Sequence, residues 1–170
     1  MNKDLTLGKR VKLKCTNYIN GVATSHQYMY IGECSKILVL DFNGIGLREI
    51  LINRIRNIFY ICVGHDSKIY VADSYGILWF IEDETGNVRQ ITIPETGYRM
   101  GNLVMDTSGH VYSPGEVSNC VYTLSSDLKL NKIITDSEFC NIRAICFSKN
   151  CSKLFVANNR GKSIIVFNCR

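Results

Sequence analysis

The sequence predicts an all-β fold: a β-propeller of four four-stranded antiparallel blades, or part of a larger ring. Short β-rich segments recur around the aromatic anchors Tyr30, Tyr70, Tyr112 and Phe155, which are 40, 42 and 43 residues apart. That spacing is the length of one blade. Polar turns rich in Gly, Asn, Asp and Ser separate the segments. No segment keeps an apolar period of 3.6 residues, so we expect no sizeable helix.

Each unit is expected to contain an apolar strand, a polar turn, the anchor strand, a polar loop, a third strand and then an alternating fourth strand. The first strand of the first unit precedes the polar turn Ser25-His26-Gln27. The other expected strands cover residues 29–32, 37–40, 47–52, 61–63, 69–72, 77–81, 88–93, 103–105, 111–114, 120–124, 130–135, 144–147, 154–157 and 164–167.

We expect a single domain over residues 1–170, with blades at about 16–53, 54–94, 95–136 and 137–170. The fourth unit stops at Arg170, just after its third strand. Residues 10–15 alternate with period two, and we predict that this N-terminal strand closes the last blade and hides its open edge. Three arrangements fit the pattern: a complete four-bladed ring, two chains that complete a larger ring, or a fragment of a longer protein.

Composition places the chain among ordinary globular proteins, with 46% hydrophobic and 21% charged residues and a net charge of +5. There is no apolar run of 18 residues and no secretory signal after Met1, so we expect a cytoplasmic protein without membrane contact. The eight cysteines include no Cys-x-x-Cys pair, and zinc sites usually draw two ligands from such a pair. We therefore expect reduced, structural thiols.

The repeat resembles the NHL type of propeller blade, whose loose pattern is apolar-D-x-x-G-x-apolar-Y-V-x-D. The segments LVMDTSGHVY (residues 103–112) and KIYVADSYGILWF (residues 68–80) carry the resemblance, together with residues 154–167. The chain after about residue 15 is similar to the C-terminal propeller of tripartite-motif (TRIM) proteins. The third unit departs from the pattern with Ser113-Pro114-Gly115-Glu116, and the first unit lacks the D-x-x-G turn. The resemblance implies a rigid disc that recognises RNA or a protein, without the ligase segments of that family.

The loops that join second to third strands, and one blade to the next, are expected on one face of a propeller. On this face we predict a binding surface of arginine, lysine and tyrosine side chains, which suit phosphate contacts and base stacking. Several acidic residues share the face, so its charge is mixed and favours a protein or peptide over single-stranded RNA. The predicted binding residues are Arg54, Arg56, Tyr75, Arg99, Arg160 and Lys162.

An enzymatic alternative is a lactonase-like hydrolase with a cation in the central channel. Its candidate oxygen ligands are Asp73, Asn102, Asn119, Asn141 and Asn158. Capping of turns by these short side chains is the favoured interpretation, because only Asp73 and Asn158 occupy equivalent blade positions.

Nucleophilic catalysis has less support, since there is no Gly-x-Ser-x-Gly elbow. The histidines fall in first-to-second-strand turns, on the opposite face; they are His26, His65 and His110. We therefore predict no catalytic residue, no metal site and no cofactor, and we expect Trp79 to pack between blades.

The predicted function is a non-enzymatic recognition platform for a protein or peptide, as at the substrate-recognition end of a TRIM-like protein. RNA binding is the alternative, and a metal-dependent hydrolase is the third option.

Overall fold

In the computed structural model the described residues are 10, 12–13, 18–55, 57–64, 67–82, 87–92, 100–126 and 129–169. The strands form four antiparallel sheets, each ordered as in the sequence, which we call blades 1 to 4. Blade 1 contains β1 (Ile19–Thr24), β2 (Met29–Glu33), β3 (Lys36–Leu40) and β4 (Gly46–Leu51). Blade 2 contains β5 (Ile58–Val63), β6 (Ile69–Asp73), β7 (Ile77–Ile81) and β8 (Val88–Thr92). Blade 3 contains β9 (Val104–Met105), β10 (Val111–Gly115), β11 (Cys120–Leu124) and β12 (Leu130–Thr135). Blade 4 contains β13 (Ala144–Phe147), β14 (Lys153–Asn158) and β15 (Ser163–Asn168).

The all-β, four-bladed antiparallel architecture is therefore confirmed. The only helical element in the described part of the chain is the short 3-10 turn η1 (Asn159–Gly161) between β14 and β15. No helix among those residues is long and apolar enough to cross a membrane.

Three tight hairpins share one Asp-x-x-Gly turn, which explains why the strands end where they do. In each turn an Asp Oδ1 atom accepts the backbone N–H groups two and four residues later, at 2.8–2.9 Å. The glycine at the fourth position has a φ of 74–82°, a conformation that is costly for residues with a Cβ atom. The turns are Asp41–Gly44, Asp73–Gly76 and Asp106–Gly109.

The aromatic anchors pack each blade against the next one along the chain. Tyr30 of blade 1 belongs to the core cluster shared with blade 2, and Tyr70 of blade 2 to the cluster shared with blade 3. Tyr112 of blade 3 packs into the cluster shared with blade 4, where its ring makes an edge-on contact with Phe147. The repeat in the sequence is thus a repeat of blade interfaces.

The alternate side chains of each blade face the blade before it. Trp79 in β7 lies in the cluster between blades 1 and 2, as predicted, and Tyr122 in β11 occupies the same position between blades 2 and 3. The fourth strand of each blade contributes to the same clusters through Ile50, Ile91 and Ile134. Each blade interface is therefore made by the second, third and fourth strands of one blade and the first, second and third strands of the next.

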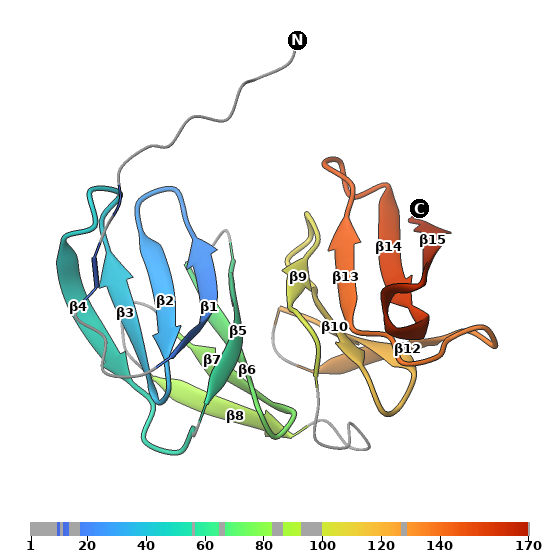
Figure 1. Ribbon diagram of the computed structural model, residues 1–170, viewed down its shortest axis with the longest axis horizontal. Helices are drawn as coiled ribbons and strands as arrows, with labels where there is room; N and C mark the ends of the chain where they lie inside the picture. Colours follow the sequence, from blue (N-terminus) through green and yellow to red (C-terminus); the bar gives the residue numbers. More distant parts are fainter. Residues whose placement is uncertain are drawn as a thin grey trace, which may run out of the picture.

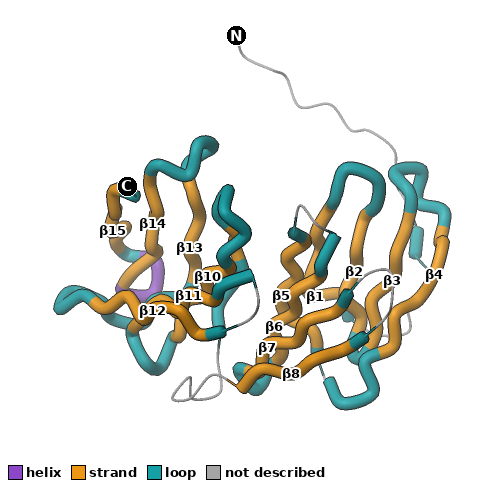
Figure 2. The backbone as a smooth tube through the Cα atoms, turned by 180° about the vertical axis from the view of Figure 1, so that it is seen from behind, coloured by secondary structure: helices purple, strands orange, loops and turns teal. Residues whose placement is uncertain are grey.

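The four blades follow one another around an open arc (Figure 1). Blades 1 and 4 stand at the two ends of the arc, and β1, β5, β9 and β13 form the inner edges of the blades; the view from behind agrees (Figure 2). The three core clusters join consecutive blades, and among the described residues none of them joins blade 4 to blade 1.

The predicted closing strand over residues 10–15 lies only partly within the described residues. Lys12 and Leu13, two of its described members, line a pocket with Leu38 and Leu40 of blade 1. Blade 4 has three strands in the described part of the chain, and β15 is its outer strand. Within one chain, Lys12 and Leu13 therefore lie on blade 1 and not beside β15.

Candidate functional site

Connections of two kinds converge on one side of the arc, which we call the loop face. They are the second-to-third-strand turns within a blade and the connections from one blade to the next. The first-to-second-strand turns lie on the opposite side, which we call the turn face. This arrangement follows from the alternating directions of the strands in each blade.

A pocket of about 200 Å³ opens on the loop face near the inner edges of the blades. We call it the axial pocket; it is lined by Tyr60, Met100, Gly101, Glu116 and Arg143. Tyr60 comes from β5, and the others lie in the β8–β9, β10–β11 and β12–β13 connections. Three blades therefore contribute to one small site.

The most polar contact of the axial pocket is the ion pair between Arg143 and Glu116. The Nε and Nη2 atoms of Arg143 both donate to Oε1 of Glu116, at 2.9 and 2.6 Å. The Arg143 side chain is still 51% exposed, whereas that of Glu116 is largely covered. Because one carboxylate oxygen takes both bonds, the guanidinium keeps donors available for an incoming carboxylate or carbonyl oxygen.

Gly101 makes the close packing around this pocket possible. A Cβ atom at position 101 would overlap the carbonyl oxygen of Arg143 and the ring of Pro114. Its backbone N–H donates to the carbonyl of Pro114 at 2.7 Å, and Met100 forms an isolated β-bridge with Gly115. Met100 and Gly101, in the described part of the β8–β9 connection, are therefore bonded to blade 3 and lie directly against the connection that carries Arg143.

Asparagine side chains hold the other connections of the loop face. Asn158 accepts the Cys140 backbone N–H at 2.7 Å and donates to the Glu138 carbonyl at 2.9 Å. Asn119 accepts the Asn141 N–H at 2.6 Å. These bonds tie the β12–β13 connection to two neighbouring turns, so the backbone on both sides of the axial pocket is fixed.

The side-chain oxygen atoms of four of the five candidate cation ligands, Asp73, Asn102, Asn119 and Asn158, accept hydrogen bonds from within the fold. Asn102 exchanges two hydrogen bonds with the backbone of Ile145, each of 2.8 Å. Asp73 accepts two turn N–H groups with Oδ1 and the indole N–H of Trp79, at 3.0 Å, with Oδ2. The turn-capping interpretation therefore holds for Asp73. The asparagines Asn102, Asn119 and Asn158 instead bond to backbone groups that are distant in the sequence.

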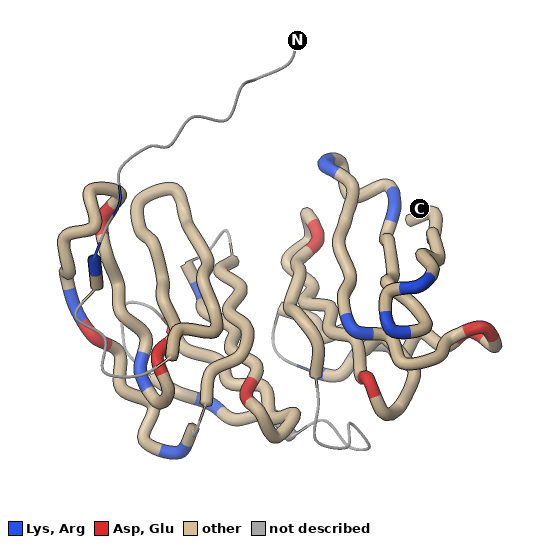
Figure 3. The backbone as a smooth tube through the Cα atoms, in the orientation of Figure 1, with Lys and Arg blue, Asp and Glu red and all other residues tan. Residues whose placement is uncertain are grey.

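The predicted binding residues lie on the loop face but do not form one cluster. Arg54 lines a pocket of about 510 Å³ between the end of blade 1 and the outer strand of blade 2. Tyr75 is exposed in the β6–β7 turn, while Arg160 and Lys162 are exposed in and after η1 of blade 4. Arg56 and Arg99 lie outside the described residues. Basic and acidic residues are interspersed over blades 1 to 3, whereas the described strands and turns of blade 4, residues 144–169, carry lysine and arginine without aspartate or glutamate (Figure 3).

Arg143 and Tyr60 were not among the predicted binding residues. The sequence carries a signal for Arg143, because it is the last residue before the inner strand of blade 4. Residues at that position converge on the axis of a propeller, whatever the length of the loop before them.

The turn face carries two of the histidines. His110 Nδ1 lies 3.0 Å from Oδ2 of Asp106, and the Tyr112 hydroxyl donates to the same oxygen at 3.0 Å. Burial alone would raise the pKa of Asp106, but the hydrogen bonds from His110 and Tyr112 hold that pKa below its usual value. His26 lines a separate pocket at the β1–β2 turn, and His65 lies outside the described residues.

No family model matches the sequence, and no curated protein is significantly similar to it. Many solved structures are similar in fold, among them a designed protein and a lyase. The computationally designed Ika4 protein has a TM-score of 0.70 at 14% identity, over 96% of this chain and all of the designed one. The virginiamycin B lyase of Staphylococcus aureus, a β-propeller, has a TM-score of 0.70 at 13% identity, over 92% of this chain and 58% of the lyase. At these identities the likeness establishes the β-propeller fold and leaves the NHL and TRIM resemblance a prediction.

Proposed function

We propose that this chain is a non-enzymatic recognition platform that binds a protein or peptide partner on its loop face. The observation that carries the proposal is the axial pocket, where the exposed guanidinium of Arg143 stands beside the partly buried ring of Tyr60. Arginine and tyrosine in a pocket are typical anchors of protein interfaces.

The loops around the axial pocket are held in place by hydrogen bonds, and this favours a role of the loop face in binding. Asn119 and Asn158 fix the connection that carries Arg143, so a partner would not have to order these loops. Such preorganisation lowers the entropic cost of association. The mixed charge of the face suits a peptide that carries both an acidic group and backbone carbonyls. By its resemblance to TRIM propellers, the chain would serve as the substrate-recognition end of a larger protein.

The proposal is tested by selecting binders from a random peptide library displayed on phage, with the full chain as bait. We expect selected peptides to lose at least tenfold in affinity for Arg143→Ala and to retain their affinity for Lys149→Ala. Lys149 is also an exposed cation, but it lies on the turn face. Peptides that bind both variants equally well would contradict the assignment of the site, provided that both variants keep the wild-type circular dichroism spectrum.

RNA binding remains the alternative, favoured by the exposed cations Arg54, Arg160 and Lys162 and by the exposed ring of Tyr75, which share the loop face. Phosphate contacts would make the affinity for a random single-stranded RNA pool fall steeply between about 50 and 200 mM salt. Fluorescence anisotropy measures this fall directly. An affinity for RNA that falls steeply with salt, and that is lost in the Arg54→Ala/Arg160→Ala variant, would favour RNA over a peptide as the partner.

A further inference from the structure

Blade 4 leaves an apolar sheet face open at the end of the arc. The face is built from two rows of directly paired residues on β13, β14 and β15. Neither row contains a charged residue, and Ile164 at the outer strand is 66% exposed. The two rows are Ala144–Ala157–Ile164 and Cys146–Phe155–Val166.

The same positions are covered by a following blade wherever the chain provides one. Phe155 is the fourth aromatic anchor, and its counterpart Tyr70 is buried in the cluster between blades 2 and 3. Leu78 and Phe80 of β7, the counterparts of Ile164 and Val166, are buried in that cluster too. The end face of blade 4 therefore has the pattern of a blade interface without a following blade.

Blade 1 carries the complementary face at the other end of the arc, and this face is exposed at its inner edge. Its central row pairs Val22, Ile31 and Leu38; Val22 is 63% exposed, whereas Ile31 is 7% exposed. In blade 2 the residues at the positions of Ile31 and Leu38 are Val71 and Trp79, which lie in the cluster with the preceding blade. Blade 1 thus presents the face that packs on a preceding blade, which we call the receiving face. Blade 4 presents the face that packs on a following blade, which we call the donating face.

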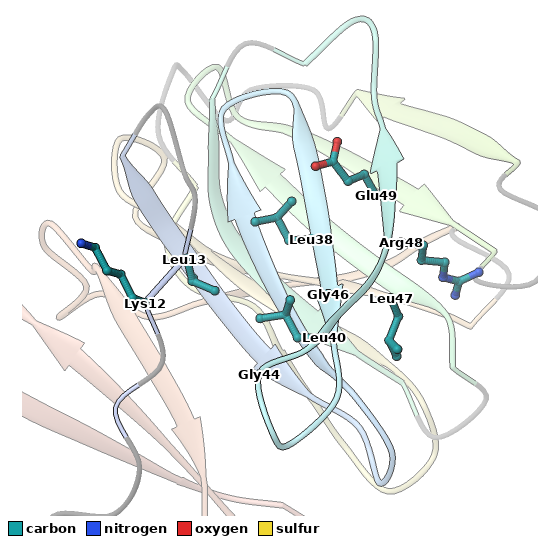
Figure 4. Close-up of a pocket in the computed structure, with 9 residues that line it drawn as sticks. All are labelled: Lys12, Leu13, Leu38, Leu40, Gly44, Gly46, Leu47, Arg48 and Glu49. Atoms are coloured by element: carbon teal, nitrogen blue, oxygen red, sulfur yellow. The ribbon is translucent and has the colours of Figure 1, made fainter.

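The N-terminal segment already occupies part of the receiving face. Leu13 points toward Leu38 and Leu40 in the pocket on blade 1, whereas Lys12 points away from it (Figure 4). Leu40 has the blade position of Ile81, which shares a core cluster with Ile50 of the preceding fourth strand. Leu13 thus takes the place of a fourth strand belonging to a blade that would precede blade 1. Blade 4, with three strands in the described residues, is the blade that lacks such a strand.

We propose that two copies of this chain associate head to tail around a two-fold axis and complete one ring. Blade 4 of each copy packs on blade 1 of the other, and the N-terminal segment of each copy becomes the fourth strand of its partner's blade 4. The arc supports this arrangement, because the four blades superpose on 58% of the virginiamycin B lyase, so the curvature between them is compatible with a ring of more than four blades. A second copy is the matching occupant because each chain carries one donating and one receiving face, as a closed head-to-tail ring requires.

Light scattering coupled to size exclusion tests the association with the full chain. We expect a mass twice that of the 19.3 kDa chain. Val22→Glu and Ile164→Lys are each expected to yield monomers, although they alter opposite ends of the arc. Val117→Lys changes a residue that is also 63% exposed but lies in the β10–β11 turn, and it should leave the dimer intact.

Mixing the two monomeric variants provides the complementary result. One interface of the mixed dimer is wild type at both faces. The other brings the lysine introduced in one copy and the glutamate introduced in its partner into the same interface, where their charges are opposite, so a dimer should reappear. A wild-type chain that stays monomeric at about 100 μM overturns the proposal, as does a ladder of higher oligomers. A dimer lost in Ile164→Lys but not in Val22→Glu would mean that blade 4 pairs with itself, which also overturns it.

Cysteine footprinting tests the same interface without altering the face that is probed. Cys146 lies on the open face of blade 4, whereas Cys140 is exposed on the loop face; both are free thiols. In the dimer, iodoacetamide should label Cys146 at least tenfold more slowly than Cys140. Val22→Glu, a change on blade 1 alone, should abolish that difference. Fast labelling of Cys146 in the wild-type chain at a concentration where it is dimeric would contradict the head-to-tail packing.

Discussion

Replacing Asp73 by alanine should destabilise the chain more than any other change to an Asp-x-x-Gly turn. Asp73 is 3% exposed, and its carboxylate accepts the N–H groups of Tyr75 and Ile77 and the indole N–H of Trp79. Without the carboxylate the indole N–H stays buried with no acceptor, which costs about 1–3 kcal/mol. The two turn N–H groups are only part-buried, and the loss of their hydrogen bonds adds about 1 kcal/mol. The expected total is about 2–4 kcal/mol.

For a chain of this length the loss lowers Tm by about 4–16 °C. Circular dichroism at a fixed protein concentration is the assay, because association would shift Tm with concentration. Asp41→Ala is the matched control: it removes the same turn bonds in an exposed hairpin without a buried indole, and its effect should be clearly smaller. In a double-mutant cycle, Trp79→Phe should recover about 1–3 kcal/mol of the Asp73→Ala loss as coupling. Equal effects of Asp73→Ala and Asp41→Ala, with no coupling to Trp79, would refute the reasoning.

Three further outcomes follow from individual residues. Arg160 adopts a left-handed backbone with φ of 56°, so Arg160→Gly should raise stability by about 0.5–1 kcal/mol in urea unfolding; a loss of stability would contradict the strain. Burial raises the pKa of Cys62 to about 11, so mass spectrometry after alkylation at pH 8 should find exposed Cys140 modified and Cys62 protected until the chain unfolds; equal rates would contradict this. The folded pKa of Asp106 lies below its unfolded value, so its stabilisation is complete above about pH 4 and is lost as the pH falls. The Tm of Asp106→Asn should therefore vary less than that of the wild type between about pH 6 and 3, and an unchanged slope would argue against it.

The blade repeat could be predicted because each blade carries one aromatic anchor residue at the same position in its second strand. The spacing from Tyr30 to Phe155 fixes how many blades the chain builds, and the Asp-x-x-Gly turns fix where the strands end. Trp79 was predictable in the same way, since a large ring in a third strand has room only between two blades.

The curvature of the arc could not be predicted from the sequence. Periodicity counts the blades but does not determine the angle between them, which depends on how side chains such as Tyr70 and Phe80 fill the interface. For the same reason the sequence could not decide whether residues 10–15 close blade 4 of the same chain or of another one. The structure places the described residue Leu13 beside Leu38, on the first blade.

The sequence predicted which face of the molecule carries the candidate site, but it did not predict the axial pocket on that face. Arg54 and Arg160 were placed on the loop face from the order of the strands alone, yet they lie on different blades. The axial pocket depends on the close approach of Gly101 to the backbone of Arg143 and on the pairing of Arg143 with Glu116. These are contacts between connections of different blades, and no local pattern encodes them.

The most direct test of the recognition platform is amide hydrogen exchange of the full chain with and without a peptide selected from the random library. We predict slower exchange on binding at residues 100–101, 116–119 and 138–143, which surround the axial pocket. Exchange at residues 25–28 and 148–152 on the turn face should not change. Protection confined to the turn face, or absent from all three segments around the axial pocket, would contradict the account.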